Sequence, residues 1–338
     1  ETPESLPAEV LAETVFSDTA RIRDILGQQR IGMEQGFAAN GHACAMARAS
    51  SYCLPAAVVR EALSGVDYYR FLKDVLEHFD ERAGELTAKL ADLAARLFTD
   101  SGCTLSFGGS EEALDAYREA SAPFGGVAGA RVLTVPAPED KHEAFVVASD
   151  VTYTACGWDR RLLGEPYGGT WLLASRILSY DFLWTEVRVK GGAYGAGFQT
   201  TRSGASRFYS YRDPRIDETV ERFRGAGSWL AGAFDPDEAE MDGYVVSSVA
   251  SLDAPAKARD LIRRQDGMYF SGYTLEDRAR VRAEVAAATA EEVRALGPAV
   301  DAVAGAGCTC VFGNREIIEA AAGGLTVIDL LNDGADPL

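Results

Sequence analysis

The stretch Trp184-Thr185-Glu186-Val187-Arg188-Val189-Lys190-Gly191-Gly192-Ala193-Tyr194-Gly195-Ala196-Gly197 passes from a charged, helix-like run through paired glycines into a strand-like run. Glycine adopts positive φ without steric cost, so Gly191 and Gly192 predict a reversal of the chain there. Such a turn brings Arg188, at a helix end, and Tyr194, at a strand start, to one cavity. A guanidinium and a phenol can both donate hydrogen bonds to a carbonyl oxygen that gains negative charge. The alternative is an exposed Arg in a weak ion pair beside a half-buried strand Tyr.

This stretch resembles the arginine and tyrosine motif in the last domain of the pitrilysin and insulinase clan of zinc metallopeptidases, in its presequence protease branch. The resemblance implies catalytic roles for Arg188 and Tyr194, which would reach across a closed chamber to the substrate at the zinc site of the N-terminal half. It also implies zinc as the cofactor of the full-length enzyme. The implied partners are the N-terminal catalytic half of the same polypeptide and peptide substrates.

Five neighbouring residues complete the predicted site. The resemblance also implies substrate binding by Gly191, Gly192 and Ala193, which lie between Arg188 and Tyr194. Glu186 and Lys190 are assigned supporting roles. Their spacing of four residues predicts an ion pair on one helix face.

The metal site of the clan is an inverted H-x-x-E-H, in which two histidines one helical turn apart hold zinc and the glutamate acts as base. The sequence has three histidines, His42, His78 and His142, and no two of them have that spacing. In the segment His78-Phe79-Asp80-Glu81-Arg82, an arginine stands where the second histidine belongs. We therefore predict that this chain binds no catalytic metal and that the zinc ligands lie in the N-terminal half.

The composition is that of a globular protein, with 47% hydrophobic and 9% aromatic residues. The 33 basic and 51 acidic residues give a net charge of −18, which opposes binding to nucleic acid or to anionic membranes. No apolar run approaches the ~20 residues that a membrane-spanning helix needs, and no basic-then-apolar signal opens the sequence. Six cysteines without a C-x-x-C pair indicate free thiols, so we predict a cytoplasmic location with no nucleic-acid or membrane partner.

An internal repeat indicates two related domains. Cys103-Thr104-Leu105-Ser106-Phe107-Gly108-Gly109-Ser110-Glu111 returns 205 residues later as Cys308-Thr309-Cys310-Val311-Phe312-Gly313-Asn314-Arg315-Glu316. Each copy has the pattern of a buried strand, a glycine turn and a short helix. We predict that residues 1–121 are the C-terminal portion of a third peptidase-like domain, mainly helical with one strand. Residues 122–130 are then a linker, and residues 131–338 a complete fourth peptidase-like domain.

The order of elements in the second copy predicts the fold class. Strands are predicted at residues 131–135, 144–148, 153–156, 194–201 and 207–211, and helices at 169–180, 215–231, 235–251, 256–269 and 275–287. Strands followed by helices favour a mostly antiparallel sheet with helices packed on one face. The predicted class is α+β, with two related α/β-sandwich domains of which the first is truncated at its N-terminus.

The functional hypothesis is the non-zinc-binding C-terminal half of an insulinase-family zinc metalloendopeptidase. This half would enclose and position short unfolded peptides for hydrolysis at a zinc site in the N-terminal half, and alone it is predicted to be inactive. Two alternatives remain: a catalytically inactive clan member that serves as a scaffold, and a peptide-binding module. The Arg188 and Tyr194 pair argues against the scaffold, since a scaffold has no use for an oxyanion donor.

Overall fold

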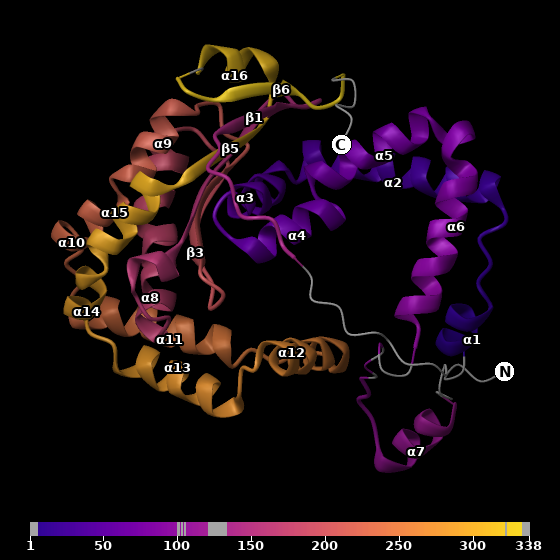
Figure 1. Ribbon diagram of the computed structural model, residues 1–338. Helices are drawn as coiled ribbons and strands as arrows, with labels where there is room; N and C mark the ends of the chain where they lie inside the picture. The colour runs from indigo at the N-terminus through magenta and orange to yellow at the C-terminus, as the bar shows by residue number, and fades with distance from the viewer. Residues whose placement is uncertain are drawn as a thin grey trace. The chain divides into compact units, whose positions relative to one another are not determined.

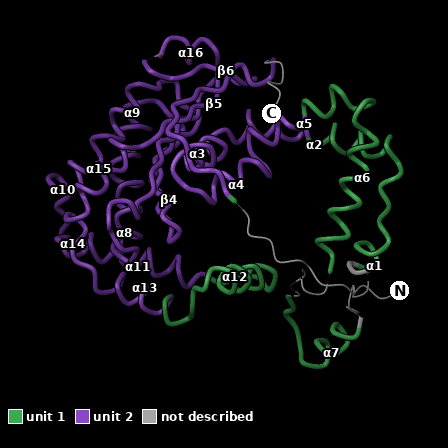
Figure 2. The backbone as a smooth tube through the Cα atoms, in the orientation of Figure 1, with its two compact units in different colours: residues 1–29, 73–134, 255–277 green, residues 30–72, 135–254, 278–338 purple. Residues whose placement is uncertain are grey.

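The computed structural model describes residues 6–99, 102, 104, 106–120, 134–321 and 323–332. The chain forms two compact units (Figure 2). Unit 1 comprises residues 1–29, 73–134 and 255–277, and unit 2 comprises residues 30–72, 135–254 and 278–338. The predicted linker at residues 122–130 lies outside the described residues, and the proposed domain bounds at residues 121 and 131 stay a prediction.

Unit 1 is helical in the part that the structure describes. Arg23 pairs with Asp80 at 2.9 Å and its guanidinium lies 5.3 Å from the ring of Phe79. The hydroxyl of Ser106 donates to Asp266 at 2.5 Å. The helices with residues in this unit are α1 (Leu6–Glu13), α2 (Thr19–Ala39), α5 (Val66–Glu77), α6 (Phe79–Leu97), α7 (Glu111–Ala120), α12 (Ala258–Ser271) and α13 (Leu275–Ala287).

The strand predicted in the first copy of the repeat is absent where the structure describes it. Thr104, Ser106 and Phe107 belong to no strand, and the first two are exposed. A strand must pair its backbone groups with a neighbour, and every described strand lies between residues 143 and 329. The second copy matches its prediction, because a buried strand, a glycine with positive φ at Gly313 and a short helix follow one another there.

Unit 2 is built on a six-stranded sheet with the order β3-β4-β2-β5-β1-β6. The three pairings among β3, β4, β2 and β5 are antiparallel, whereas β5 with β1 and β1 with β6 are parallel. The predicted mixed fold with a mostly antiparallel sheet is therefore confirmed. The strands are β1 (Glu143–Val146), β2 (Thr152–Asp159), β3 (Gly195–Thr200), β4 (Ala205–Tyr211), β5 (Cys308–Gly313) and β6 (Thr326–Asp329).

Helices cover both faces of this sheet, as Figure 1 shows for α8, α10 and α15 on one side and α3 and α4 on the other. The prediction had helices on one face only. Residues alternate between the two faces of a strand, and both sets are apolar here, so each face needs a cover. The helices with residues in unit 2, besides α2, α5 and α13, are α3 (Gly41–Ser51), α4 (Pro55–Ser64), η1 (Arg160–Leu163), α8 (Gly169–Ile177), η2 (Leu178–Lys190), α9 (Asp217–Arg224), α10 (Ala226–Gly232), α11 (Glu238–Leu252), α14 (Ala290–Ala295), α15 (Gly297–Ala306) and α16 (Arg315–Ala320).

Two cores follow from this alternation. Phe198 and Phe208 pair across β3 and β4 and join Trp171 of α8 in the first core. On the opposite face, Phe145 and Phe312 pack with residues of α3 in the second core. Fully burying an aromatic side chain of this size contributes about 1.5–3 kcal/mol, so segments far apart in the sequence are held on one sheet.

A buried ion cluster joins α3 to the sheet through Arg48, which is 4% exposed. Its Nε donates to Glu143 of β1 at 2.9 Å, and its Nη1 donates to Asp67 at 2.9 Å and to Glu61 at 3.3 Å. Burial raises the pKa of Glu61 above its ordinary value of 4.5, against the effect of Arg48. Burial acts the same way on Glu143, but Arg48 and the hydroxyl of Tyr52 outweigh it and lower that pKa. The guanidinium of Arg48 thus donates hydrogen bonds to three carboxylates.

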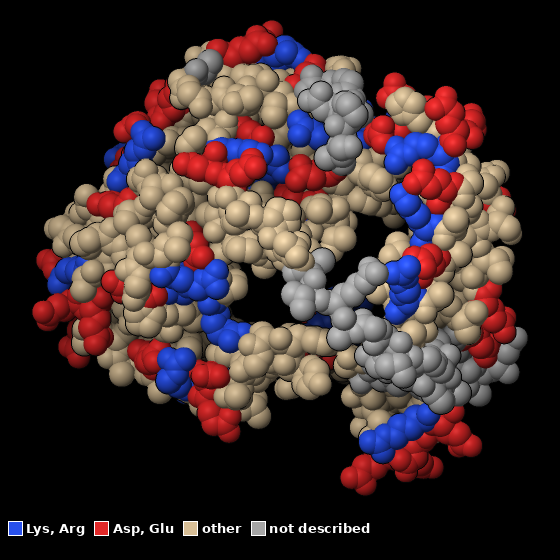
Figure 3. Space-filling model, viewed as in Figure 1, with Lys and Arg blue, Asp and Glu red and all other residues tan. Residues whose placement is uncertain are grey.

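The surface carries charges of both signs. On the face shown in Figure 3, Lys and Arg side chains lie among Asp and Glu side chains. Among the described residues, no helix combines the length and the apolar character that crossing a bilayer requires.

Candidate functional site

The helix that leads into the predicted site changes its winding along its length. It begins as α8 and continues as the π-helix η2 up to Lys190. Ser179, in the first turn of η2, bonds with its Oγ to the backbone N–H of Phe198 at 3.0 Å and to its carbonyl at 3.3 Å. π-helical segments are rare in proteins, and those that occur are often found at functional sites. Here the hydrogen bonds of Ser179 join the segment to β3, the edge strand that pairs with β4 in the described sheet.

The two glycines end this helix in different ways. Gly192 has φ of +86°, in the region that favours glycine, and its N–H donates to the carbonyl of Arg188 at 3.0 Å. Gly191 has an ordinary φ of −82°. A Cβ at Gly191 would lie 2.3 Å from the carbonyl oxygen of Val187 and 2.5 Å from Nη1 of Arg222. The predicted positive φ is therefore correct for Gly192 only. At Gly191, glycine is required because the neighbouring atoms leave no room for a Cβ.

Arg188 and Tyr194 come together as the turn predicts. Cζ of Arg188 lies 3.7 Å from the centroid of the Trp184 ring and 5.8 Å from that of Tyr194. The backbone N–H of Tyr194 donates to the carbonyl of Tyr211 at 3.0 Å, and their rings meet edge to face at 5.8 Å. The side chain of Tyr194 is 68% exposed. No described carboxylate lies within 4.0 Å of Arg188, so the alternative of a weak ion pair does not describe this arginine.

The other predicted site residues, among them Glu186, Lys190 and Ala193, lie close to this pair in the sequence. Glu186 and Lys190 form the expected ion pair at 2.5 Å, one helical turn apart. Ala193 is buried, and its N–H donates to the carbonyl of Val187 at 3.3 Å. The backbone N–H groups of Gly192 and Ala193 already donate hydrogen bonds within the turn. The backbone of these residues could therefore bind a ligand only through carbonyl oxygens, as hydrogen-bond acceptors.

Two aromatic neighbours were given no role by the sequence analysis. Trp184 lies four residues before Arg188, a spacing that places side chains on one helix face, and this was the signal that could have revealed it. His42 of α3 packs edge to face against Tyr211 at 4.8 Å, a contact between distant segments that no local pattern indicates. Burial lowers the pKa of His42 below 6.5, which keeps this imidazole neutral at pH 7.

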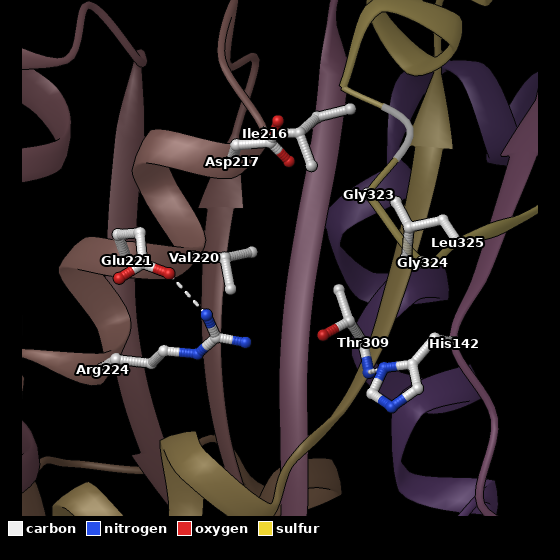
Figure 4. A pocket seen from close by; sticks show the side chains of 10 residues that line it. All are labelled: His142, Ile216, Asp217, Val220, Glu221, Arg224, Thr309, Gly323, Gly324 and Leu325. Atoms are coloured by element: carbon white, nitrogen blue, oxygen red, sulfur yellow. Dashed lines mark hydrogen bonds and ion pairs between the residues drawn. The ribbon is translucent and has the colours of Figure 1, made fainter.

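A cavity of about 400 Å³ lies elsewhere in unit 2, between α9 and the loop before β6 (Figure 4). Arg224 points into it and pairs with Glu221 of the same helix, and Nδ1 of His142 accepts the N–H of Thr309 at 3.2 Å. Neither Arg188 nor Tyr194 lines this cavity. Two of its polar side chains, Arg224 and His142, already have partners within the protein.

No three His, Cys, Asp or Glu side chains in the part of the chain that the structure describes are placed to hold a metal ion together. His78, at the start of α6, instead contacts Asp74 of the preceding helix at 3.3 Å. The described residues therefore do not fit a zinc site.

Gly192→Ala is expected to lower the free energy of unfolding by about 1–2 kcal/mol, because a Cβ at left-handed φ meets the following carbonyl oxygen. The space around Gly192 is open, since a Cβ at this position would meet only Cγ of Pro214, at 3.6 Å, so strain in the backbone is the sole cost. Urea unfolding followed by tryptophan fluorescence measures the change. Gly232→Ala, in a helix with open space around it, is the matched control and should not destabilise; equal losses in both variants would contradict the assignment.

The fold and this turn define a class: a mixed α/β domain that presents an arginine and a tyrosine together at a helix–strand junction. The family model described as PreP C-terminal domain matches residues 142–311, half of the chain. A second model, for a region associated with peptidases of subfamily C of family M16, matches residues 4–75. The chain belongs to the presequence protease family of the insulinase clan and corresponds to a part of its C-terminal half.

The similar proteins are longer than this chain. Protein HypA of Clostridium perfringens is 28% identical over 317 residues, covering 92% of this chain and 32% of that protein. Presequence protease 1, chloroplastic/mitochondrial, of Arabidopsis thaliana is 26% identical over 323 residues, covering 92% and 29%. The chain thus spans about a third of the length of these curated relatives. The solved peptidase M16 inactive domain from Pseudomonas fluorescens is 20% identical, with a TM-score of 0.43 over 61% of this chain and 52% of that one.

Proposed function

We propose that this chain is the substrate-positioning half of a zinc metalloendopeptidase that hydrolyses short unfolded peptides. The observation that carries the proposal is the Arg188–Tyr194 pair. Its guanidinium and its exposed phenol are neighbours, and the guanidinium has no carboxylate partner among the described residues. Membership of the presequence protease family supports the reaction class.

The chemistry of the pair suits a peptide carbonyl. When water attacks a peptide bond, the carbonyl oxygen gains negative charge, and donors fixed in advance stabilise that charge most effectively. Cζ of Arg188 lies over the Trp184 ring, 3.7 Å from its centroid, and a guanidinium that rests on a ring face keeps the N–H groups at its edge free to donate. The Tyr194 hydroxyl supplies a second donor from the start of β3. Both groups would also orient the peptide backbone before attack.

The metal of this reaction is assigned to the N-terminal half. Zinc activates water and polarises carbonyls when bound, and the described residues of this chain offer no site for it. Peptide enclosure between two halves belongs to the same proposal. So does a cytoplasmic location, which the free thiols of Cys44, Cys53, Cys156, Cys308 and Cys310 support.

A peptide-binding module without catalysis is the second candidate. The exposed rings of Tyr180, Trp184 and Tyr194 favour it, because aromatic faces on a surface commonly mark recognition sites. The inactive scaffold is disfavoured, since Tyr194 is exposed and the Arg188 guanidinium has no carboxylate partner among the described residues.

Reconstitution separates these candidates. Mixing this chain with its separately produced N-terminal half is expected to restore hydrolysis of a short fluorogenic peptide, while neither half alone hydrolyses it. A chelator that removes zinc should abolish the restored activity. The proposal is wrong if the N-terminal half alone has the full rate, and the binding module is favoured if this chain binds the peptide but never supports cleavage.

A further inference from the structure

A second guanidinium–aromatic pair lies on the helix that carries Arg188. Cζ of Arg176 is 5.2 Å from the ring centroid of Tyr180, just as Arg188 stacks on Trp184. The four residues follow one another at intervals of four along α8 and η2. Side chains four positions apart are neighbours on a helix surface. We call these four residues the Arg–aromatic stripe.

The cations of the stripe have no acidic partner. Among the described residues, no carboxylate lies within 4.0 Å of Arg176 or Arg188, although the sequence carries a net charge of −18. The two acidic residues of η2 are engaged elsewhere: Asp181 accepts the hydroxyl of Tyr244, and Glu186 pairs with Lys190. Arg176 makes one long hydrogen bond, to Oγ of Ser251 at 3.4 Å.

The aromatic members of the stripe are open to solvent. The side chain of Tyr180 is 59% exposed and that of Trp184 is 43% exposed. A guanidinium that rests on an aromatic face keeps its donor edge free and can bind a carboxylate through two parallel hydrogen bonds. The stripe therefore offers a ligand two carboxylate-binding cations separated by apolar ring faces.

We propose that Arg176 and Tyr180 form a subsite for a carboxylate of the same peptide whose backbone is held by Arg188 and Tyr194. The inference rests on the proposed function for peptide binding at Arg188 and Tyr194. The subsite at Arg176 and Tyr180 is supported by its positive charge, which has no acidic partner among the described residues, and by its position on the same continuous helix. The bound group is either an Asp or Glu side chain or the C-terminal carboxylate, and Tyr180 and Trp184 contact the side chains between the two anchors.

The helix sets the spacing between the anchors. Arg176 and Arg188 are 12 residues apart, and most of the interval lies in the π-helix η2, which rises less per residue than the about 1.5 Å of an α-helix, so their separation along the helix is less than about 18 Å. An extended peptide advances about 3.3 Å per residue. The carboxylate should therefore lie at most about five residues from the residue bound at Arg188.

Fluorescence anisotropy with this 338-residue chain tests the subsite without requiring cleavage. The probes are short labelled peptides with an amidated C-terminus and one Glu at successive positions, each matched by a Gln peptide, and one neutral peptide with a free C-terminus. The best-placed Glu peptide should bind about twofold to fivefold more tightly than its Gln counterpart, the range for one partly exposed ion pair. A preference for the free C-terminus alone would identify the terminal carboxylate as the ligand.

Arg176→Gln should remove the preference for the carboxylate, Tyr180→Phe should keep it and Tyr180→Ala should weaken it. Arg263→Gln, on the exposed surface of α12, removes the same charge elsewhere and should leave the preference unchanged. Equal affinities for charged and neutral peptides, or equally undetectable binding at millimolar concentration, would overturn the proposal, as would equal effects of the two Arg variants. Because binding is measured without hydrolysis, a carboxylate preference can persist even where the proposed peptidase function fails.

Discussion

Tyr194→Phe in the full-length protein is expected to lower kcat by about ten to a thousand fold, the usual cost of removing one donor to an oxyanion. KM should change little, because a bond that strengthens mainly in the transition state contributes to kcat rather than to ground-state binding. The substitution removes only a hydroxyl. The Tyr194 ring meets Tyr211 edge to face at 5.8 Å, and Phe preserves that contact. Steady-state hydrolysis of a short fluorogenic peptide gives both constants.

The matched control for this variant is Tyr269→Phe. Tyr269 of α12 is 74% exposed and is not part of the Arg188–Tyr194 turn, so kcat and KM should both stay at the wild-type values. Circular dichroism and the unfolding midpoint establish that each variant is folded. An unchanged kcat for Tyr194→Phe would remove the catalytic role from this hydroxyl and leave Arg188 as the only candidate donor of the pair.

Local patterns were sufficient to predict most elements of unit 2. Alternating residues in 153–156 and 207–211 identify strands β2 and β4, because one face of a strand repeats every second residue. Paired glycines identify the end of η2, because only glycine tolerates the φ of Gly192 without strain. The approach of Arg188 to Tyr194 follows from that turn. These features depend on neighbours in the sequence, and sequence patterns report such neighbours directly.

Features that depend on distant partners were missed. Residues 41–51 gave no sign that α3 would cover the second face of the sheet, and the buried contacts of Arg48 join α3 to carboxylates that lie 13 to 95 positions away. The helix predicted over 169–180 and the helix-like run that ends near Arg188 form one continuous helix, which is a π-helix from Leu178 to Lys190 and is bonded to β3 through Ser179. The helix predicted over 215–231 is interrupted at Gly225 between α9 and α10. Tertiary contacts override local propensity at α3 and η2, whereas the break at Gly225 falls at a residue of low helix propensity.

Arg48→Met is expected to lower the free energy of unfolding by about 3–5 kcal/mol, because it leaves buried carboxylates without their counter-charge. Glu61 is 2% exposed and Glu143 is 8% exposed, so water cannot replace the lost guanidinium. Methionine fills a similar volume, which limits the contribution of a cavity. Urea unfolding at pH 7 measures the loss, and Trp158, Trp171 and Trp229 of unit 2 provide the fluorescence signal.

The pH dependence of this loss distinguishes an electrostatic cause from a packing defect. Without Arg48, Glu61 and Glu143 lose a main effect that opposes burial, so their folded-state pKa values rise relative to the wild type, although the N–H of Val66 still acts on Glu61 and the hydroxyl of Tyr52 on Glu143. A group whose pKa is raised on folding stabilises the fold when protonated, and that stability is lost as the pH rises through the folded-state value. The difference between Arg48→Met and the wild type should therefore be largest at pH 7 and shrink as the pH falls toward 4.5.

Two further variants test the cause. Arg23→Met removes an exposed pair, with Arg23 49% and Asp80 85% exposed, and should cost at most about 1 kcal/mol. Combining Arg48→Met with Glu61→Gln and Glu143→Gln should recover part of the lost stability at pH 7, because the buried negative charges are then absent. A deficit that is the same at pH 5 and pH 7, and that the Gln substitutions do not reduce, would show that Arg48 acts through packing of its aliphatic stem rather than through its charge.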